Sequence, residues 1–296
     1  MIFAACLLLG VLCLCAGSFF GAYVVRYGRG ESVAKGRSKC DHCGRALSWR
    51  DNIPLLSWLF LKRRCRYCQH RLSFFYPAIE LTTGLAFSAL FVLVTNSAWL
   101  AITPHLFLRY LLVMVIACSL IIIFFTDQLS GLVPDSAIVV GVIFAALLKL
   151  WDTGFGIWQF RASLLSPTNP LGTYLLKTDY FRSNVLAGWV LPFGYDIAGA
   201  LGAAIFFLFL VAITKGRGMG LGDVKFAFLL GLIVGWPRVL VALFLEFVLG
   251  ALYSVLLILL KKKHFGQTIH FGPFLVLSIP LALLWGDTLL RLYLGI

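Results

Sequence analysis

Residues 107–125 read FLRYLLVMVIACSLIIIFF, a run of 19 residues with a single charge, Arg109. About 20 mostly apolar residues in a helix cross the hydrocarbon core of a bilayer, so this stretch predicts a membrane-spanning helix. The whole chain has the same character: of its 296 residues, 61% are hydrophobic and 12% are charged, and the mean hydropathy is +0.95. Soluble domains contain about 45–50% apolar and about 25% charged residues. The composition therefore excludes a soluble cytosolic or secreted enzyme and indicates an integral membrane protein.

Seven further apolar segments are separated by polar breaks. Together with residues 107–125 they predict an all-α polytopic membrane protein of about eight transmembrane helices with a small cytoplasmic loop domain. One of them, Val224–Trp236, is shorter than a full span. The remaining predicted spans are Ile2–Val25, Pro77–Val94, Val133–Trp151, Ile197–Thr214, Val239–Leu260 and Phe271–Leu294.

The positive charge is concentrated in the segment Arg26–Tyr76, which holds 12 Lys and Arg against 3 Asp and Glu, or +9 of the net +13. Because Lys and Arg accumulate in cytoplasmic loops, we expect this segment in the cytoplasm, and the excess calls for no nucleic-acid partner. No charge precedes Arg26 and no cleavable signal pattern is evident, so the first helix is expected to be retained with its N-terminus outside. The neutral break Asp152–Asp196 is expected outside, as an irregular or interfacial segment. The predicted parts are residues 1–25, 26–76 and 77–296.

The eight cysteines fall into two groups. Cys40, Cys43, Cys65 and Cys68 form the pattern C-x2-C-x21-C-x2-C inside the basic loop, and this spacing is typical of one tetrahedral Zn²⁺ site. Disulfides are the alternative, but a cytoplasmic loop is kept reduced. Four cysteine ligands leave no open position for water, so the metal is predicted to be structural. The neighbouring His42 and His70 are predicted to be solvated. The other cysteines lie in apolar spans, where small buried hydrophobes are expected: Cys6, Cys13, Cys15 and Cys118.

Acidic residues next to the predicted spans are candidate functional residues. A carboxylate near the membrane interior costs free energy, so such a residue is expected to have a partner or a function. Asp127 ends the third predicted span, and Asp223 stands in Gly220-Leu221-Gly222-Asp223 at the start of the sixth. The eight-span topology places both at the cytoplasmic face, which is what a pair of catalytic aspartates sharing one proton requires. Gly220 and Gly222 would let the backbone bend and a substrate strand approach closely.

Simpler interpretations of the same acids remain open. Asp223 could pair with Lys225, and Asp127 could be a solvated carboxylate at a helix end. Asp135 could be an acid that favours a helix N-terminus. Glu80 and Glu246 are lone acids within apolar spans, and their roles stay undetermined. The chain contains no H-E-x-x-H, G-x-S-x-G or phosphate-loop motif.

In combination, these residues resemble the bacterial type IV prepilin (leader) peptidases, intramembrane aspartic proteases of the Gly-x-Gly-Asp type. The similarity follows the chain in order. Two departures are Arg26-Tyr27-Gly28, where the family has Arg-Leu-Pro, and the long break 152–196. The matching segments are Gly17-Ser18-Phe19, the two Cys pairs, Asp51-Asn52-Ile53-Pro54 with Ser57-Trp58, Tyr76-Pro77 with Glu80-Leu81, Asp127 to Asp135, Gly220 to Lys225 and Phe271-Gly272-Pro273-Phe274.

The resemblance implies an inner-membrane enzyme that removes the basic leader of prepilins or pseudopilins after a glycine at the cytoplasmic face. It implies Asp127 and Asp223 as the catalytic pair, with Asp135 at a position that the family can fill with Asn. Many family members also N-methylate the new amino terminus with S-adenosylmethionine, and no residue here is assigned to that step. Two other hypotheses are a transporter that uses the aspartates as an ion relay, and a non-catalytic component of pilus or secretion assembly.

Overall fold

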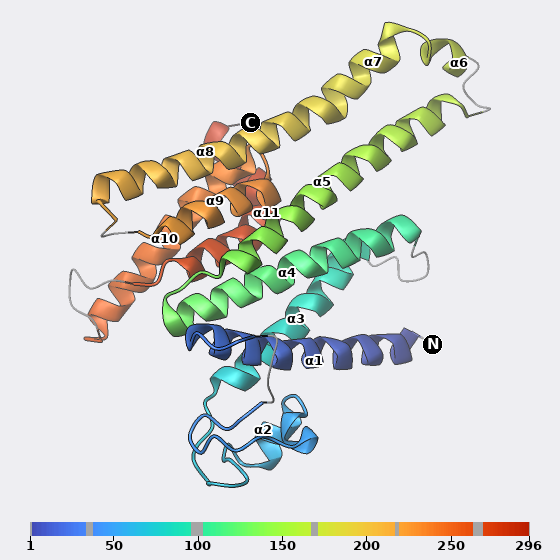
Figure 1. Cartoon of the computed structure of the whole chain (residues 1–296). Coiled ribbons are helices and arrows are strands. Elements are labelled where there is room, and N and C mark those ends of the chain that lie inside the picture. The colour runs from blue at the N-terminus through green and yellow to red at the C-terminus, as the bar shows by residue number, and fades with distance from the viewer. Residues whose placement is uncertain are drawn as a thin grey trace. The chain divides into compact units, whose positions relative to one another are not determined.

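The computed structural model describes residues 2–33, 38–95, 103–166, 171–216, 219–262 and 269–295, and for residues 2–12 it describes the backbone alone. In these ranges all regular elements are helices, apart from two isolated β-bridges in the loop (Figure 1). The predicted all-α membrane fold is therefore confirmed. The chain forms two compact units, Met1–Ala137 and Ile138–Ile296. The three-part division at residues 25 and 76 stays a prediction.

The first unit is built on three long helices, α1 (Ile2–Gly28), α3 (Phe75–Thr95) and α4 (Pro104–Ser130), each packed against the other two. Between α1 and α3 the chain forms the four-cysteine loop, which contains the 3-10 turn η1 (Trp49–Asn52) and the short helix α2 (Leu56–Phe60). The core of the three-helix packing is apolar and consists of Cys13, Phe20, Val24, Ile79, Phe87, Ile121 and Phe125.

Local sequence signals explain both ends of α4. At its start the Thr103 hydroxyl accepts a hydrogen bond from the Leu106 N–H, and Pro104 takes a position where a missing N–H costs nothing. At its end Gly131 has φ +66, and its N–H donates to the Asp127 carbonyl oxygen. This glycine cap stops the helix just after Asp127 and leaves a short turn before α5.

The second unit contains α5 (Asp135–Leu164), which begins at the end of the first unit, α6 (Gly172–Leu175), α7 (Asp179–Val185), the π-turn η2 (Leu186–Val190), α8 (Leu191–Thr214), α9 (Leu221–Val234), α10 (Arg238–Leu259) and α11 (Gly272–Leu294). Helix α9 packs against α8, α10 and α11. Gly231 of α9 allows the closest approach, because a Cβ there would lie 2.5 Å from the Ala200 Cα of α8. Small residues at such crossings are typical of membrane helix pairs.

The expectation of an irregular segment at 152–196 is wrong for most of its described part. Helix α5 continues to Leu164, and α7, η2 and α8 form one continuous helical stretch from Asp179 to Thr214 (Figure 1). The π-turn ends two residues before Pro192, which has no N–H to give to the preceding turn, and the wider turn accommodates this proline within the helix.

Six helical segments in the described ranges are long and apolar enough to cross a membrane: Phe75–Leu93, Pro104–Ser130, Asp135–Leu164, Asp179–Thr214, Arg238–Leu259 and Gly272–Tyr293. Helix α9, the sixth predicted span, has 14 residues and is shorter than a full crossing. Helix α1 has 27 residues, but its first side chains lie outside the description. The count of eight spans therefore stays a prediction.

The expected burial of the membrane cysteines holds in part. Cys13 is buried, but Cys15 is exposed on the surface of α1 and Cys118 is half-buried. Cys6 lies among the residues whose side chains are not described. Exposure of Cys15 is compatible with a membrane helix, because lipid is as apolar as a protein core and a small thiol faces either at little cost.

Candidate functional site

The four loop cysteines lie in two turns of the same design. In the first, the Cys40 N–H donates to the Arg45 carbonyl and the Gly44 N–H donates to the Cys40 carbonyl. In the second, the Cys65 N–H donates to the His70 carbonyl, and the Gln69 N–H donates to the Cys65 carbonyl. Gly44 and Gln69 occupy equivalent positions with φ +68 and +56. The two Cys-x-x-Cys turns thus share the same backbone hydrogen-bond pattern.

The two turns bring the sulfur atoms of Cys40, Cys43, Cys65 and Cys68 within 4.8 Å of one another. A tetrahedral Zn²⁺ with bonds of about 2.3 Å places its sulfur ligands about 3.8 Å apart, and the Cys40 and Cys68 Sγ atoms are 3.8 Å apart. The His70 amide favours the Cys68 thiolate, but desolvation and the neighbouring thiols outweigh it and raise the pKa of Cys68 to about 11. The cluster therefore has the composition and spacing to hold a metal cation, whose positive charge would favour the thiolate form of the four cysteines.

His42 and His70 do not join the cysteine cluster. Both are exposed, and their rings stack on each other with centroids 4.1 Å apart. The prediction that they are solvated is confirmed.

Asp51 connects two parts of the four-cysteine loop. Its Oδ2 accepts hydrogen bonds from the Ser48 hydroxyl at 2.7 Å and the Ser48 N–H at 3.1 Å, and its Oδ1 pairs with Arg66 at 2.8 Å. Burial opposes ionisation of this carboxyl, but the Ser48 hydrogen bonds and the Arg66 charge outweigh it and hold the pKa of Asp51 below its usual range. Asp51 thus joins the segment before α2 to the second cysteine turn.

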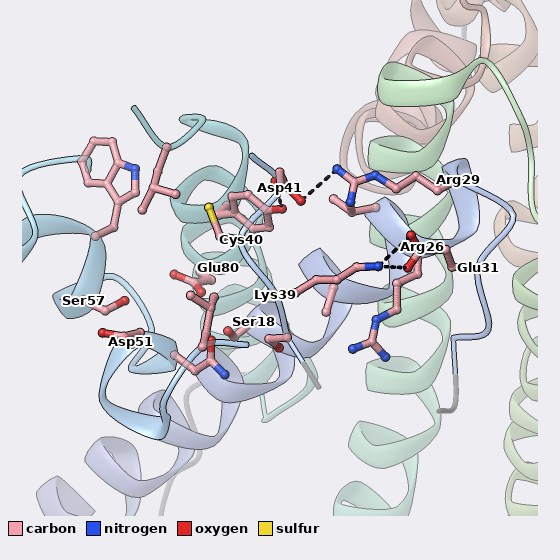
Figure 2. A pocket seen from close by; sticks show the side chains of 18 residues that line it. Ser18, Arg26, Arg29, Glu31, Lys39, Cys40, Asp41, Asp51, Ser57 and Glu80 are labelled. Carbon is pink, nitrogen blue, oxygen red and sulfur yellow. Dashed lines mark hydrogen bonds and ion pairs between the residues drawn. The ribbon is translucent and has the colours of Figure 1, made fainter. Parts of the chain in front are cut away.

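A polar pocket of about 120 Å³ lies between α1, the loop and the start of α3 (Figure 2). Its lining carries both signs of charge, and Cys40 belongs to its wall, so the four-cysteine cluster borders the pocket. Glu80 of α3 is 7% exposed and accepts the Leu55 N–H at 2.7 Å. The sequence indicated Glu80 as a lone acid but gave no sign of Leu55, because that contact exists only when the loop folds back onto α3. The charged and hydroxyl lining residues labelled in the figure include Ser18, Arg26, Arg29, Glu31, Lys39 and Asp41.

Asp127 is placed in the last turn of α4, where it is 5% exposed. The interpretation of Asp127 as a carboxylate in open water is therefore wrong. Its neighbours in the turn are also closed off, since Phe125 and Thr126 are buried and the Thr126 hydroxyl donates to the Ile122 carbonyl at 2.7 Å. Asp135 differs, because it is exposed at the first turn of α5, where an acid meets the positive end of the helix dipole.

Asp223 stands in the first turn of α9, and its Oδ2 accepts the Gly220 N–H at 3.1 Å. This contact fixes the carboxylate at the amino end of the helix, where the dipole favours negative charge. Gly220 has φ −91 and ψ 163, a conformation open to any residue. Backbone conformation therefore does not require this glycine, and the close approach predicted for Gly220 and Gly222 stays a prediction.

Glu246 of α10 is a further acid in the second unit. It is fully buried, and neither carboxylate oxygen has a hydrogen-bond partner in the part of the chain that the structure describes. The Asp223 charge acts on it, which places the two carboxyls within electrostatic range. Sequence reasoning singled out Glu246 only as an acid in an apolar span.

The structure thus brings the four cysteines together and places Glu246 near Asp223. Asp127 belongs to the first unit and Asp223 to the second. Their pairing therefore stays a prediction.

Two segments of the chain match known families. Residues 11–94 match the family described as Bacterial Peptidase A24 N-terminal domain, and residues 181–255 match the Type IV leader peptidase family. The four cysteines and Glu80 lie in the first segment, whereas Asp223 and Glu246 lie in the second.

Curated relatives extend this similarity over most of the chain. The prepilin leader peptidase/N-methyltransferase of Bacillus subtilis (strain 168) is 31% identical over 283 residues, which cover 95% of this chain and 94% of the relative. The protein of that name from Aeromonas salmonicida (strain A449) is 31% identical over 88% of this chain and 75% of its own length. The one from Pseudomonas aeruginosa is 31% identical over 87% and 74%. No solved structure matches the chain.

The matched segments contain the four-cysteine loop and the Gly-x-Gly-Asp helix start, and the Bacillus subtilis relative aligns almost from end to end with this chain. The chain therefore belongs to the type IV leader peptidase family.

Proposed function

We propose that this protein is an intramembrane aspartic endopeptidase that removes the basic leader of type IV prepilins or pseudopilins. Cleavage falls after a glycine at the cytoplasmic face, and Asp127 and Asp223 are the catalytic pair. The observation that carries the proposal is the burial of Asp127 in the last turn of α4, in a chain 31% identical to prepilin leader peptidases over nearly its whole length.

The order of the helices supports the pairing of the two aspartates. Two candidate spans, Asp135–Leu164 and Asp179–Thr214, separate Asp127 from Asp223 in the sequence. Two crossings return the chain to the face from which it started. Both acids then lie at the same membrane face, each within one turn of a helix end.

In this mechanism the two carboxyls share one proton, because like charges at short range do not both ionise. The ionised member takes a proton from a water molecule, and this water attacks the scissile carbonyl. The protonated member donates to the carbonyl oxygen as the tetrahedral centre forms. Gly220 and Gly222 have no Cβ atom, so an extended substrate strand can lie close against the start of α9. There the strand is held in line with the two aspartates.

We also propose that the protein N-methylates the new amino terminus, as the second half of the relatives' name describes for them. S-adenosylmethionine supplies the methyl group in this step. The four-cysteine cluster holds a structural Zn²⁺ whose binding free energy folds the loop, since all four positions of the metal are taken by protein sulfur.

The charge distribution supports an orientation in the bacterial inner membrane. With +9 in residues 26–76, that segment and the active site face the cytoplasm and the N-terminus lies outside. The partners are then the lipid bilayer and a prepilin or pseudopilin, whose basic leader stays on the cytoplasmic side.

The proposal is tested by incubating the purified full-length protein with a prepilin, S-adenosylmethionine and detergent, and by measuring the masses of the products. We expect loss of the leader after a glycine, followed by a mass increase of one methyl group. An intact prepilin after prolonged incubation would contradict the proposal. A transporter or a non-catalytic assembly component, which no described feature favours, would leave the prepilin uncut.

A further inference from the structure

An apolar groove of about 630 Å³ lies in the second unit, between α8 and α10, with α9 packed against both helices (Figure 1). The chemistry proposed for Asp127 and Asp223 makes no use of it. We infer that this groove seats the apolar helix of the prepilin, with the scissile end of that helix beside Asp223. The inference rests on the proposed function, because only a substrate cut just before its apolar helix presents such a segment.

The two walls of the groove run in parallel and meet at one end. Near the start of the walls, a Cβ at Gly199 of α8 would lie 3.3 Å from the Val239 Cγ1 of α10. Seven and eight residues further along these helices, the rings of Phe206 and Phe247 meet edge to face with their centroids 6.1 Å apart. Both phenylalanines line the groove, so this ring pair bridges the walls and closes the groove at that end.

The closed end of the groove lies almost level with Asp223. Gly231 of α9 packs on Ala200 of α8, and four residues further on Gly235 packs on a residue four positions before Ala200. The two helices therefore run antiparallel. Six residues beyond this crossing, Phe206 lies two residues short of the level of Asp223. At 1.5 Å per residue, the ring pair is about 3 Å from Asp223 along the helix axis.

The lining of the groove suits a helix better than a lipid chain. Between its aromatic ends, α8 contributes small residues alone, whereas α10 contributes large apolar ones. Small residues at a membrane helix contact let the two backbones approach closely, and a flexible acyl chain has no need of them. A Cβ at Gly202 would meet no described atom within 4 Å, so the groove is open there. The small residues are Ala198, Gly199, Gly202 and Ala203.

The length of the groove fits the part of the substrate next to the cut. The α8 wall runs from Tyr195 to Phe206, which is about 16 Å or about three turns of helix. The first three turns of the substrate helix fill this length, starting at the ring pair. The rings block a helix from continuing past them, so the chain leaves the helix there. The scissile segment then lies extended beside Asp223, as the proposed mechanism needs.

The first test measures prepilin cleavage by the full-length protein over a range of substrate concentrations. Gly202→Leu fills the groove with a side chain. Gly194→Leu is the matched control, because it makes the same change on the same helix outside the groove. Neither glycine has a described atom within 4 Å of an added Cβ, so neither change starts with a clash. Circular dichroism in detergent checks that both variants fold.

We expect Gly202→Leu to raise KM about 10-fold, the lower end of what overfilling a fitted apolar site costs. The value of kcat should stay near the wild type, because the helix contact is lost equally from the bound substrate and the transition state. Gly194→Leu should keep the wild-type KM. A truncated peptide that ends three residues after the cut has no helix to seat, so the wild type and Gly202→Leu should cleave it equally well.

The second test locates the substrate directly by photocrosslinking. Benzoylphenylalanine replaces Phe244, which lines the groove and is 67% exposed, or Leu208, which is 50% exposed on α8 outside the groove. Each protein is irradiated with prepilin in vesicles of phosphatidylethanolamine and phosphatidylglycerol, and mass spectrometry identifies the molecule and the residue attached. We expect the probe at Phe244 to join the prepilin within about three turns after the cut, and the probe at Leu208 to join lipid.

An unchanged KM in Gly202→Leu overturns the inference and leaves the proposed cleavage intact. An equal loss with prepilin and with the truncated peptide overturns it as well, since the change would then act on the site as a whole. Attachment of the Phe244 probe to lipid alone, or to a second copy of this protein, gives the groove another occupant and has the same consequence.

A wild type that leaves prepilin uncut overturns the proposed function itself, whereas a wild type that cleaves without attachment at Phe244 overturns the inference alone. If Gly202→Leu does not fold, or if the wild type does not cleave the truncated peptide, the attachment at Phe244 decides by itself.

Discussion

The four-cysteine loop and the α9–α10 helix pair hold their polar side chains in opposite ways. In the loop, Asp51 Oδ2 accepts hydrogen bonds from Ser48, its Oδ1 forms an ion pair with Arg66, and the four cysteine sulfurs lie within 4.8 Å of one another. In the helix pair, Glu246 is fully buried and its oxygens have no hydrogen-bond partner among the described residues. The loop has little apolar core, and we propose that polar contacts and a bound metal stabilise it. The helices are held by packing and tolerate a polar group that costs free energy.

Removal of the metal should give the largest effect, and it should be confined to the loop. Structural zinc contributes about 10–16 kcal/mol of binding free energy, which a loop of this size cannot replace. We expect replacement of Cys40, Cys43, Cys65 and Cys68 by serine to abolish metal binding and open residues 38–73 to proteolysis. The helical content measured by circular dichroism should stay near the wild-type value.

Metal analysis of the purified protein checks the same prediction, with about one zinc per chain expected from four thiolate ligands. Full metal content in the quadruple variant would contradict the assignment. Loss of the membrane helices together with the loop would contradict the contrast between the two regions.

Helix packing around α9 is tested at Gly231, where α9 crosses α8. A methyl group there would lie 2.5 Å from the Ala200 Cα, so Gly231→Ala should separate α8 from α9 and cost about 1–3 kcal/mol, as overpacking does. Gly202→Ala is the control, because no described atom lies within 4 Å of the added group. There the better helix propensity of alanine should gain about 0.5–1 kcal/mol. Equal stability of the two variants in a detergent denaturation series would show that the crossing is not close.

An effect of similar size is expected at Glu246, but its sign is opposite to that of most core substitutions. Leucine is similar in size and needs no hydrogen bond, so Glu246→Leu should raise the stability by about 1–3 kcal/mol, the cost of a buried unsatisfied polar group. Glu246→Gln keeps a polar group and should change the stability less. A clear loss of stability in the leucine variant, measured by the same denaturation series, would show that this carboxyl has a stabilising partner.

The smallest effect is expected at Asp51. The pKa of Asp51 is lowered in the folded loop, so its contribution is complete above the unfolded value of about 3.9 and is lost only as the pH falls through the lower folded value. Arg66 is half exposed, and the ion pair should contribute less than about 1 kcal/mol. The difference in proteolytic half-life between the wild type and Asp51→Asn should be small and constant from pH 5 to pH 8. A difference that grows or shrinks across this range would contradict the assignment.

The parts of the fold and site that depend on local pattern could be predicted from the sequence. The spacing of Cys40, Cys43, Cys65 and Cys68 is enough to indicate a metal cluster, and apolar runs are enough to indicate membrane helices. The extension of α5 to Leu164 was missed, because polar residues at a membrane boundary do not interrupt a helix.

The contact between Leu55 and Glu80 could not be predicted either, since it joins residues 25 apart through a strained turn. The burial of Glu246 within electrostatic range of Asp223 could not be predicted for a similar reason. Its neighbourhood is set by helix packing, and no local motif reports it.

The central claim is that Asp127 and Asp223 act as one catalytic unit, and it is tested by prepilin cleavage in single and double Asp→Asn variants. Each single variant should lose cleavage almost as completely as the double variant, because residues that act together are not additive. Asp135→Asn should retain much of the activity, since Asp135 is exposed at a helix start. If a folded Asp223→Asn protein processed prepilin near the wild-type rate, the aspartic-protease mechanism would be wrong.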